Sequence, residues 1–275
     1  NSVCYVDGDI SEWSDAALVC QNGDMSVSMQ YDEKFLYFLI HKDNLKFEEE
    51  TLYLPIDTTP KTGSSYCRNF GLKFDRGADF IVVLNGPDNS RVMVQERYES
   101  LRSTYSQEID GFDTYLADNI PDADSPDFVT IKMALEIYNI PEEAQAEWNL
   151  DFGEATFETG RLKYGNANPQ SAQFDSLADF IANGDYIELR LPWQLLNFAD
   201  PSKMSIHDDY FSGNYGVEYL TIDKMYVGVM TADSAGRCAL SAFPLDGWGN
   251  KVTWHERLKS SYYVMQQLWS RAAES

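Results

Sequence analysis

The chain has 275 residues, of which 44% are hydrophobic and 14% aromatic, and this apolar content is sufficient for a sizeable core, so whole-chain intrinsic disorder is excluded. Acidic residues outnumber basic ones by 44 to 21, and the formal charge of −23 argues against nucleic acid and anionic membranes as partners. No apolar run reaches the ~18 residues of a membrane-spanning helix, so no membrane span is predicted.

The first distinctive segment is residues 5–13, which read Y-V-D-G-D-I-S-E-W. The Asp7-Gly8 step predicts a turn, because Gly accepts a positive φ and the Asp side chain can bond nearby backbone N–H groups. Trp13 returns five residues after the glycine and is predicted to fold back over the turn as an apolar plug.

Alternation and short apolar runs then predict a series of β-strands. Residues 26–30 (S-V-S-M-Q) alternate, and residues 34–41 (K-F-L-Y-F-L-I-H) form an apolar run suited to a central strand buried on both faces. Residues 31–33 are predicted as the hairpin turn between them. Further strands are expected at residues 51–57, at 79–85 and 91–98 (a hairpin across G-P-D-N), at 152–162, at 223–230 and at 237–243.

Residues 186–196 (Y-I-E-L-R-L-P-W-Q-L-L) predict a strand that ends in a corner. Glu188 and Arg190 alternate with apolar residues, so one face is predicted to be buried and the other solvated. Pro192 ends the strand because it lacks a backbone donor, and Trp193 is expected to pack in the short turn that follows.

The C-terminal residues 254–273 carry apolar side chains at spacings of three and four, which predicts an amphipathic helix. The helix is expected to pack against the β-strands and close the domain; the alternative is that it docks onto a neighbouring domain.

Four of these segments, residues 5–13, 29–40, 53–63 and 186–196, resemble the family 9 carbohydrate-binding modules and related DOMON-like β-sandwiches. Such domains open with an Asp-Gly turn, an acidic residue and a Trp. A Y-D-E-K-Y-L-Y type hairpin, an I-D-T-x-P-x-x-G segment and an I-P-W-x-L-L corner follow. The matches occur in one order along the chain, and the resemblance implies an extracellular or cell-surface location.

The predicted fold is all-β, an antiparallel, jelly-roll-like β-sandwich. It covers residues 1–275 as a single enlarged domain, with a long insertion near residues 100–180 and the C-terminal amphipathic helix. We find no internal repeat and no linker rich in Pro, Gly or Ser.

Four cysteines, Cys4, Cys20, Cys67 and Cys238, are widely spaced and include no C-x-x-C pair, which argues against a zinc site or a thioredoxin-type motif. Cys4 and Cys20 flank the first turn and could form a bridge. Three pairings are open for four cysteines, and free buried thiols are at least as well supported.

Catalytic motifs are not found. The three histidines lie in no H-E-x-x-H or G-x-S-x-G context. A glycosidase requires two carboxyls roughly 5–10 Å apart across a groove, and no segment singles out such a pair. A haem site would need axial ligands such as Met204 and His207, although a Met more commonly packs in a core. We therefore expect no catalytic residues and no enzymatic activity.

Calcium prefers several hard oxygen ligands, which Asp-rich turns supply, and the family resemblance implies structural calcium. The first candidate set is Asp7 and Asp9, with Asp57 approaching from a later strand. The second is the acidic loop of residues 122–127 (D-A-D-S-P-D). The competing interpretation of both sets is a solvated acidic loop.

Sugar rings present apolar faces that stack on aromatic side chains. Trp248 lies in P-L-D-G-W-G-N, where a large ring has little local cover, and in family 9 modules two Trp side chains sandwich a terminal sugar. Trp248 with Trp148 or Trp254 is the candidate pair here, and packing under loops is the competing interpretation. The polar loop supplies the candidate hydroxyl contacts Asn166, Asn168 and Gln170.

The predicted function is a noncatalytic carbohydrate-binding module within a larger glycan-active or cell-surface protein. The expected partners are an oligosaccharide or polysaccharide and neighbouring domains of the larger chain. The first alternative is a structural or protein-interaction appendage that has lost its sugar site, and the second is an enzyme acting on glycans. Burial of both Trp248 and Trp148 would favour the interaction appendage.

Overall fold

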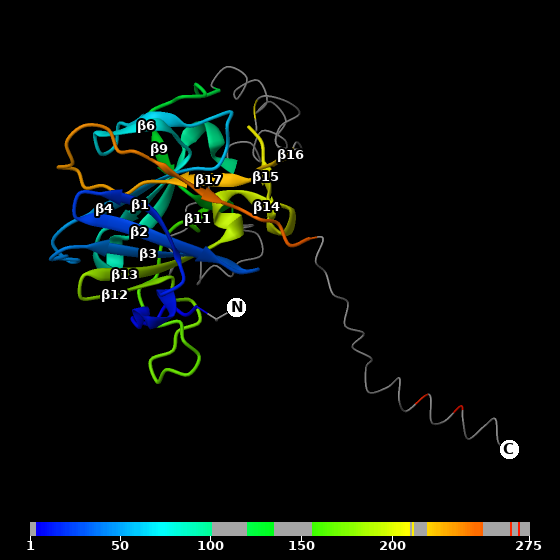
Figure 1. Ribbon diagram of the computed structural model, residues 1–275. Helices are drawn as coiled ribbons and strands as arrows, with labels where there is room; N and C mark the ends of the chain where they lie inside the picture. The colour runs from blue at the N-terminus through cyan, green and yellow to red at the C-terminus, as the bar shows by residue number, and fades with distance from the viewer. Residues whose placement is uncertain are drawn as a thin grey trace, which may run out of the picture.

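The computed structural model describes residues 4–100, 120–134, 156–209, 211, 219–249, 265 and 269. Over these residues the chain forms two antiparallel sheets that pack face to face (Figure 1). A five-stranded sheet has the order β1-β2-β3-β13-β12, and a six-stranded sheet has the order β18-β17-β4-β7-β8-β9. The prediction of an all-β, antiparallel sandwich is thereby confirmed.

The five-stranded sheet is built around β3, the apolar run that was predicted as a central strand. Its strands are β1 (Ala17–Asn22), β2 (Met25–Tyr31), β3 (Phe35–Lys42), β13 (Tyr186–Pro192) and β12 (Phe180–Asn183). β3 is buried from Leu36 to Ile40, because strands pair with both of its edges and apolar layers cover both of its faces. The β2–β3 hairpin turns at residues 32–34, one residue later than predicted.

The six-stranded sheet is also buried on both faces in its centre. Its strands are β18 (Ser241–Pro244), β17 (Lys224–Val227), β4 (Leu52–Asp57), β7 (Phe80–Leu84), β8 (Arg91–Gln95) and β9 (Phe128–Thr130). Every residue of β4 and β7 is buried. The hairpin predicted over residues 79–98 forms from β7 and β8, and the short α1 (Gly86–Asn89) joins them.

Smaller elements surround the two sheets. The short strands are β5 (Ser64–Cys67), β6 (Leu72–Ala78), β10 (Lys132–Ala134), β11 (Thr156–Glu158), β14 (Phe198–Asp200), β15 (Ser205–His207) and β16 (Tyr219–Thr221). The 3-10 helices are η1 (Ile10–Trp13), η2 (Glu96–Tyr98), η4 (Trp193–Leu196) and η5 (Pro201–Lys203). The predicted strand of residues 152–162 is described only from residue 156 and is shorter than expected.

The main hydrophobic core lies between the sheets and draws on residues from Cys20 to Leu245. A second apolar layer covers the outer face of the five-stranded sheet, where Trp13 packs with Tyr37, Leu39 and Ala178. A third covers the outer face of the six-stranded sheet and includes Phe74 of β6. Both sheets therefore need covering segments on their outer faces, and one of these segments is the N-terminal turn.

The structure also bears on the cysteines and on membrane-spanning helices. Cys4, Cys20, Cys67 and Cys238 are all buried free thiols, so Cys4 and Cys20 are not bridged. Within the described part of the chain, no helix is long and apolar enough to cross a membrane.

The C-terminal amphipathic helix is not supported. Residues 254–273 lie outside the described residues except for Met265 and Trp269, and these two side chains are 45% and 70% exposed. Both lie on the face that was expected to pack against the sandwich. Their exposure gives no indication of that packing.

Candidate functional site

The N-terminal turn is held on the sandwich by one buried carboxylate, Glu188 of β13. Gly8 has φ +88°, as the turn prediction requires. One oxygen of Glu188 accepts hydrogen bonds from the backbone N–H groups of Asp7 (3.1 Å) and Gly8 (2.5 Å). The other accepts from Nε1 of Trp13 at 2.7 Å, and Trp13 is buried as predicted. A single side chain thus fixes both ends of the opening segment.

The prediction that Glu188 faces solvent is wrong, since the residue is only 1% exposed. The alternation in β13 is real, but the N-terminal segment covers the face on which Glu188 lies. Burial raises the pKa of Glu188 to about 7, although the three N–H groups favour the charged carboxylate. Burial also raises the pKa of Glu12.

The polar loop that was predicted to bind sugar hydroxyls contacts the N-terminal turn, and its sugar contacts stay a prediction. Asn168 donates from Nδ2 to the carboxylate of Asp7 at 2.7 Å, and Asn166 donates to the Asp7 carbonyl at 3.3 Å. Their side-chain oxygens accept from the backbone N–H groups of Asn168 and Gln170, both at 2.9 Å. Both Asn side chains therefore hold the loop in place, and Gln170 is exposed beside them.

The described residues contain one acidic group in which three carboxylates could hold a metal ion. Oxygen atoms of Asp7, Glu12 and Glu188 lie within 4.8 Å of one another. Five of their six oxygens already accept hydrogen bonds from protein N–H groups. Calcium needs about six to eight oxygen ligands, so these bonds would have to be rearranged around the ion. Structural calcium stays a prediction, and of its predicted ligands Asp7 lies in this group.

The other predicted calcium ligands lie elsewhere. Asp9 is exposed and caps η1 by accepting from the backbone of Ser11 at 3.0 Å. Asp57 ends β4 in the other sheet, where Arg76 donates to it at 2.6 Å. In the acidic loop of residues 122–127, the last carboxylate pairs with Arg68 at 3.2 Å. The structure therefore brings neither Asp9 nor Asp57 into the group around Asp7.

Trp248 and Tyr31 form the candidate sugar-stacking surface. Their rings stack with centroids 6.4 Å apart and planes at 30°. The Tyr31 ring also forms T-shaped pairs with Trp193 and Phe243, with ring centroids 5.4 and 6.0 Å apart. Its hydroxyl donates to the Asp246 carbonyl and accepts from the Asp246 backbone N–H. Tyr31 is thus fixed from several directions, and Trp248, which is half-buried, rests on it.

Two glycines let the loop that carries Trp248 approach η5 closely. A Cβ at Gly247 would lie 2.7 Å from the carbonyl oxygen of Ser202, and the backbone N–H of Gly249 donates to that oxygen at 2.7 Å. Any larger residue at Gly247 would push the loop away. The D-G-W-G sequence therefore positions Trp248 as well as leaving it uncovered.

A cleft of about 620 Å³ lies beside this ring pair. Its lining residues are Tyr31, Asp32, Glu33, Lys34, Asp246, Gly247 and Trp248. The carboxylate of Asp32 already accepts from two backbone N–H groups of the hairpin turn and from the Tyr37 hydroxyl. The side chains of Glu33, Lys34 and Asp246 form no hydrogen bond or ion pair within the described structure, and all three are exposed. The cleft thus offers ring faces together with uncommitted donors and acceptors.

Among the other tryptophans that the structure describes, Trp193 does not line this cleft. Trp193 is fully buried, and its Nε1 donates to the Asp32 carbonyl at 3.0 Å. Trp148 and Trp254, the predicted partners of Trp248, lie outside the described residues. Their pairing with Trp248 stays a prediction, and the described ring that stacks on Trp248 is that of Tyr31. Its place at the end of an alternating strand, next to the hairpin turn, was the available sequence signal.

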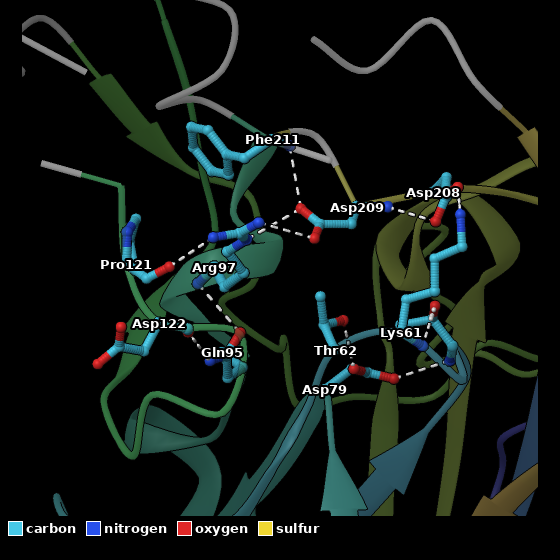
Figure 2. A network of polar contacts seen from close by, with 11 residues as sticks. Lys61, Thr62, Asp79, Gln95, Arg97, Pro121, Asp122, Asp208, Asp209 and Phe211 are labelled. Carbon is cyan, nitrogen blue, oxygen red and sulfur yellow. Dashed lines mark hydrogen bonds and ion pairs between the residues drawn. The ribbon is translucent and has the colours of Figure 1, made fainter. Parts of the chain in front are cut away.

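A separate polar network lies at another part of the sandwich (Figure 2). Arg97 forms a two-bonded ion pair with Asp209, at 3.0 and 2.9 Å, and Lys61 pairs with Asp208. Asp79, which is fully buried, accepts from the backbone of Thr58 and Thr59 and from the hydroxyl of Thr62. These groups satisfy one another, so we interpret the network as structural.

No family model matches the chain, and no match was found among the curated proteins or the solved structures. The resemblance to family 9 modules therefore stays a prediction, and the function has to be argued from the site itself.

Proposed function

We propose that this domain is a noncatalytic carbohydrate-binding module that stacks a sugar ring at the cleft beside Tyr31 and Trp248. The observation that supports the proposal is an aromatic pair lining a cleft in which the charged side chains of Glu33, Lys34 and Asp246 have no partner within the described residues. Sugar recognition needs an apolar ring face for the C–H surface of the sugar and nearby donors and acceptors for its hydroxyls.

The chemistry of the cleft favours a neutral ligand. Its volume of about 620 Å³ falls within the roughly 300–1,000 Å³ of ordinary small-molecule sites. Three acidic side chains, Asp32, Glu33 and Asp246, face one Lys34, and the whole chain carries a formal charge of −23. An acidic field of this kind repels polyanionic glycans and does not oppose neutral ones. In line with the resemblance, the proposal includes an extracellular or cell-surface location within a larger glycan-active protein.

Isothermal titration against a panel of neutral oligosaccharides tests the proposal. We expect binding of at least one sugar, and we expect Trp248→Ala to weaken it by roughly tenfold, since loss of one stacked ring is worth about 1 kcal/mol or slightly more. Trp269→Ala is the matched control, because Trp269 is 70% exposed and does not line the cleft.

Binding that is equally tight in the Trp248→Ala variant would refute the stacking site. A folded protein that binds no sugar of the panel would refute the function. The recovered ligand is analysed by chromatography; we expect it to be returned intact, and cleaved sugar would instead indicate an enzyme.

The structural or protein-interaction appendage stays the competing proposal. It is favoured by the partial burial of Trp248. The Trp248 ring lies against Trp193, with ring centroids 5.9 Å apart, as well as against Tyr31. If Trp248 has only a packing role, its replacement will lower the thermal stability and leave sugar binding, where present, unchanged. The same pair of variants therefore distinguishes the two functions.

A further inference from the structure

A second concave surface lies at the opposite end of β3 from the Trp248 cleft. One cleft of about 890 Å³ is lined by Pro87, Asp88, Thr156, Phe157, Glu158, Thr159, Arg161, Leu162, Lys163 and Tyr164. A neighbouring cleft of about 410 Å³ is lined by residues 46–49, Tyr164, Ala182 and Gly184. The two clefts share Tyr164, and we call the combined surface the Tyr164 groove.

Three aromatic rings line the groove, those of Phe47, Tyr164 and Phe157. Tyr164 is 37% exposed and stacks on Phe47, with centroids 5.8 Å apart and planes at 25°. Beneath it, the buried Phe180 of β12 meets Tyr164 edge to face at 5.3 Å, so the ring is supported from the core. Further along, Phe157 of β11 is 59% exposed. Three rings thus present apolar faces from separate elements of the fold.

The charges that line the groove are largely neutralised within the protein. Lys163 pairs with Asp175 at 2.7 Å, and Glu158 pairs with Arg91 at 3.1 Å. Arg161 donates to the carbonyl of Asp88 at 3.0 Å. The lining of the two clefts carries three basic side chains (Lys46, Arg161 and Lys163) and four acidic ones (Glu48, Glu49, Asp88 and Glu158), so neither sign dominates. A strongly charged ligand finds no matching field there, whereas a neutral ligand rich in hydroxyl groups finds donors and acceptors beside the rings.

We propose that the Tyr164 groove binds an internal segment of a neutral polysaccharide chain, as a second site distinct from the Trp248 cleft. The proposal rests on the proposed carbohydrate-binding function and extends its ligand class from short sugars to chains. An open groove with rings spaced along it suits a ligand that repeats one apolar face. A protein partner would favour a contiguous apolar patch instead.

The two sites are far enough apart to act separately. The Trp248 cleft includes the turn before β3, and the Tyr164 groove includes the loop after it. β3 has eight residues, which span roughly 25 Å at ~3.3 Å per residue. One long chain, or two chains, can therefore occupy both sites, and binding through both increases the apparent affinity without new contacts.

Affinity electrophoresis in gels that contain xylan, mannan, mixed-linkage β-glucan or starch, with alginate as the anionic comparison, tests the proposal. We expect retardation by at least one neutral polysaccharide and none by alginate. Phe157→Ala and Tyr164→Ala are each expected to weaken retardation by roughly tenfold, whereas Tyr164→Phe keeps the ring and the retardation. Phe174→Ala is the matched control, because Phe174 is 46% exposed and lines neither cleft.

Equal retardation of the Phe157→Ala, Tyr164→Ala and Phe174→Ala proteins would overturn the proposal, as would retardation by no neutral polysaccharide. Phe157 is exposed, so its variant provides the result even if Tyr164→Ala fails to fold. The Trp248→Ala variant separates the two proposals. If Trp248→Ala loses oligosaccharide binding and Phe157→Ala leaves retardation unchanged, the cleft is supported and the groove is refuted. If Trp248→Ala keeps oligosaccharide binding and Phe157→Ala weakens retardation, the groove is supported and the cleft is refuted.

Discussion

Replacing Glu188 by Gln tests how the N-terminal turn is held, and it does so through the pH dependence of stability. The ordinary pKa of a Glu side chain is 4.5, and burial beside Asp7 raises that of Glu188 to about 7. The native state therefore binds a proton that the unfolded state releases. The stabilising contribution is fully present below pH ~4.5 and is lost as the pH rises through about 7.

The magnitude follows from the two pKa values. At ~1.36 kcal/mol for each pKa unit, the difference between 4.5 and about 7 corresponds to about 3 kcal/mol of unfolding free energy. The amide side chain of the Glu188→Gln variant does not titrate, so this part of the pH dependence is absent from it.

Urea denaturation of both proteins between pH 4.5 and 8.5 measures the effect. The unfolding free energy of the wild type minus that of Glu188→Gln is expected to fall by about 3 kcal/mol across this range. Carboxylates remote from Glu188, such as Asp79, titrate in both proteins and cancel in the difference. The opposite trend, a difference that grows with pH, would show that the three N–H donors of Asp7, Gly8 and Trp13 outweigh burial and hold Glu188 ionised.

Two further predictions concern charge in the rest of the fold. If the group of Asp7, Glu12 and Glu188 holds calcium, millimolar Ca²⁺ will raise the melting temperature of the wild type and not that of Glu188→Gln. Equal melting curves of the wild type with Ca²⁺ and with EDTA would refute the calcium prediction. Asp79→Ala is expected to lower the unfolding free energy by about 3 kcal/mol in urea denaturation, because it leaves buried donors unpaired. Asp233→Ala, at an exposed site, is the control. A loss of unfolding free energy in Asp79→Ala no larger than that in Asp233→Ala would contradict this prediction.

The strands of the sheets could be predicted because buried strands have a recognisable pattern of apolar residues in the local sequence. Residues 34–41 are apolar without interruption between Lys34 and His41, and they form most of β3, which is covered on both faces. The turn at Gly8 was recognisable because few residues accept its positive φ. These features depend on short stretches of chain and need no knowledge of what packs against them.

The local sequence does not show which distant segments a side chain contacts in the folded protein. Glu188 and Asp7 are 181 positions apart, and alternation in β13 predicted the wrong environment for Glu188 because a distant segment covers it. Asn168 was predicted to bind a ligand from its polarity, and its bond to Asp7 could not be foreseen from that polarity. Asp57 was grouped with Asp7, although Asp7 bonds to a strand of one sheet and Asp57 ends a strand of the other. The corrections at Glu188 and Asp57 both concern which segments lie together, a property of the assembled sandwich.

The tryptophans show why function is harder to predict than fold. A Trp that plugs a core and a Trp that stacks a ligand look alike in sequence, and they differ only in how many faces the protein itself covers. Trp13 and Trp193 are enclosed and give their Nε1 hydrogens to Glu188 and to the Asp32 carbonyl. Trp248 rests on Tyr31 and lines an open cleft. Because close approach of Gly247 and Gly249 to Ser202 fixes the loop, Trp248 is preorganised, and a ligand that stacks there would not have to order it.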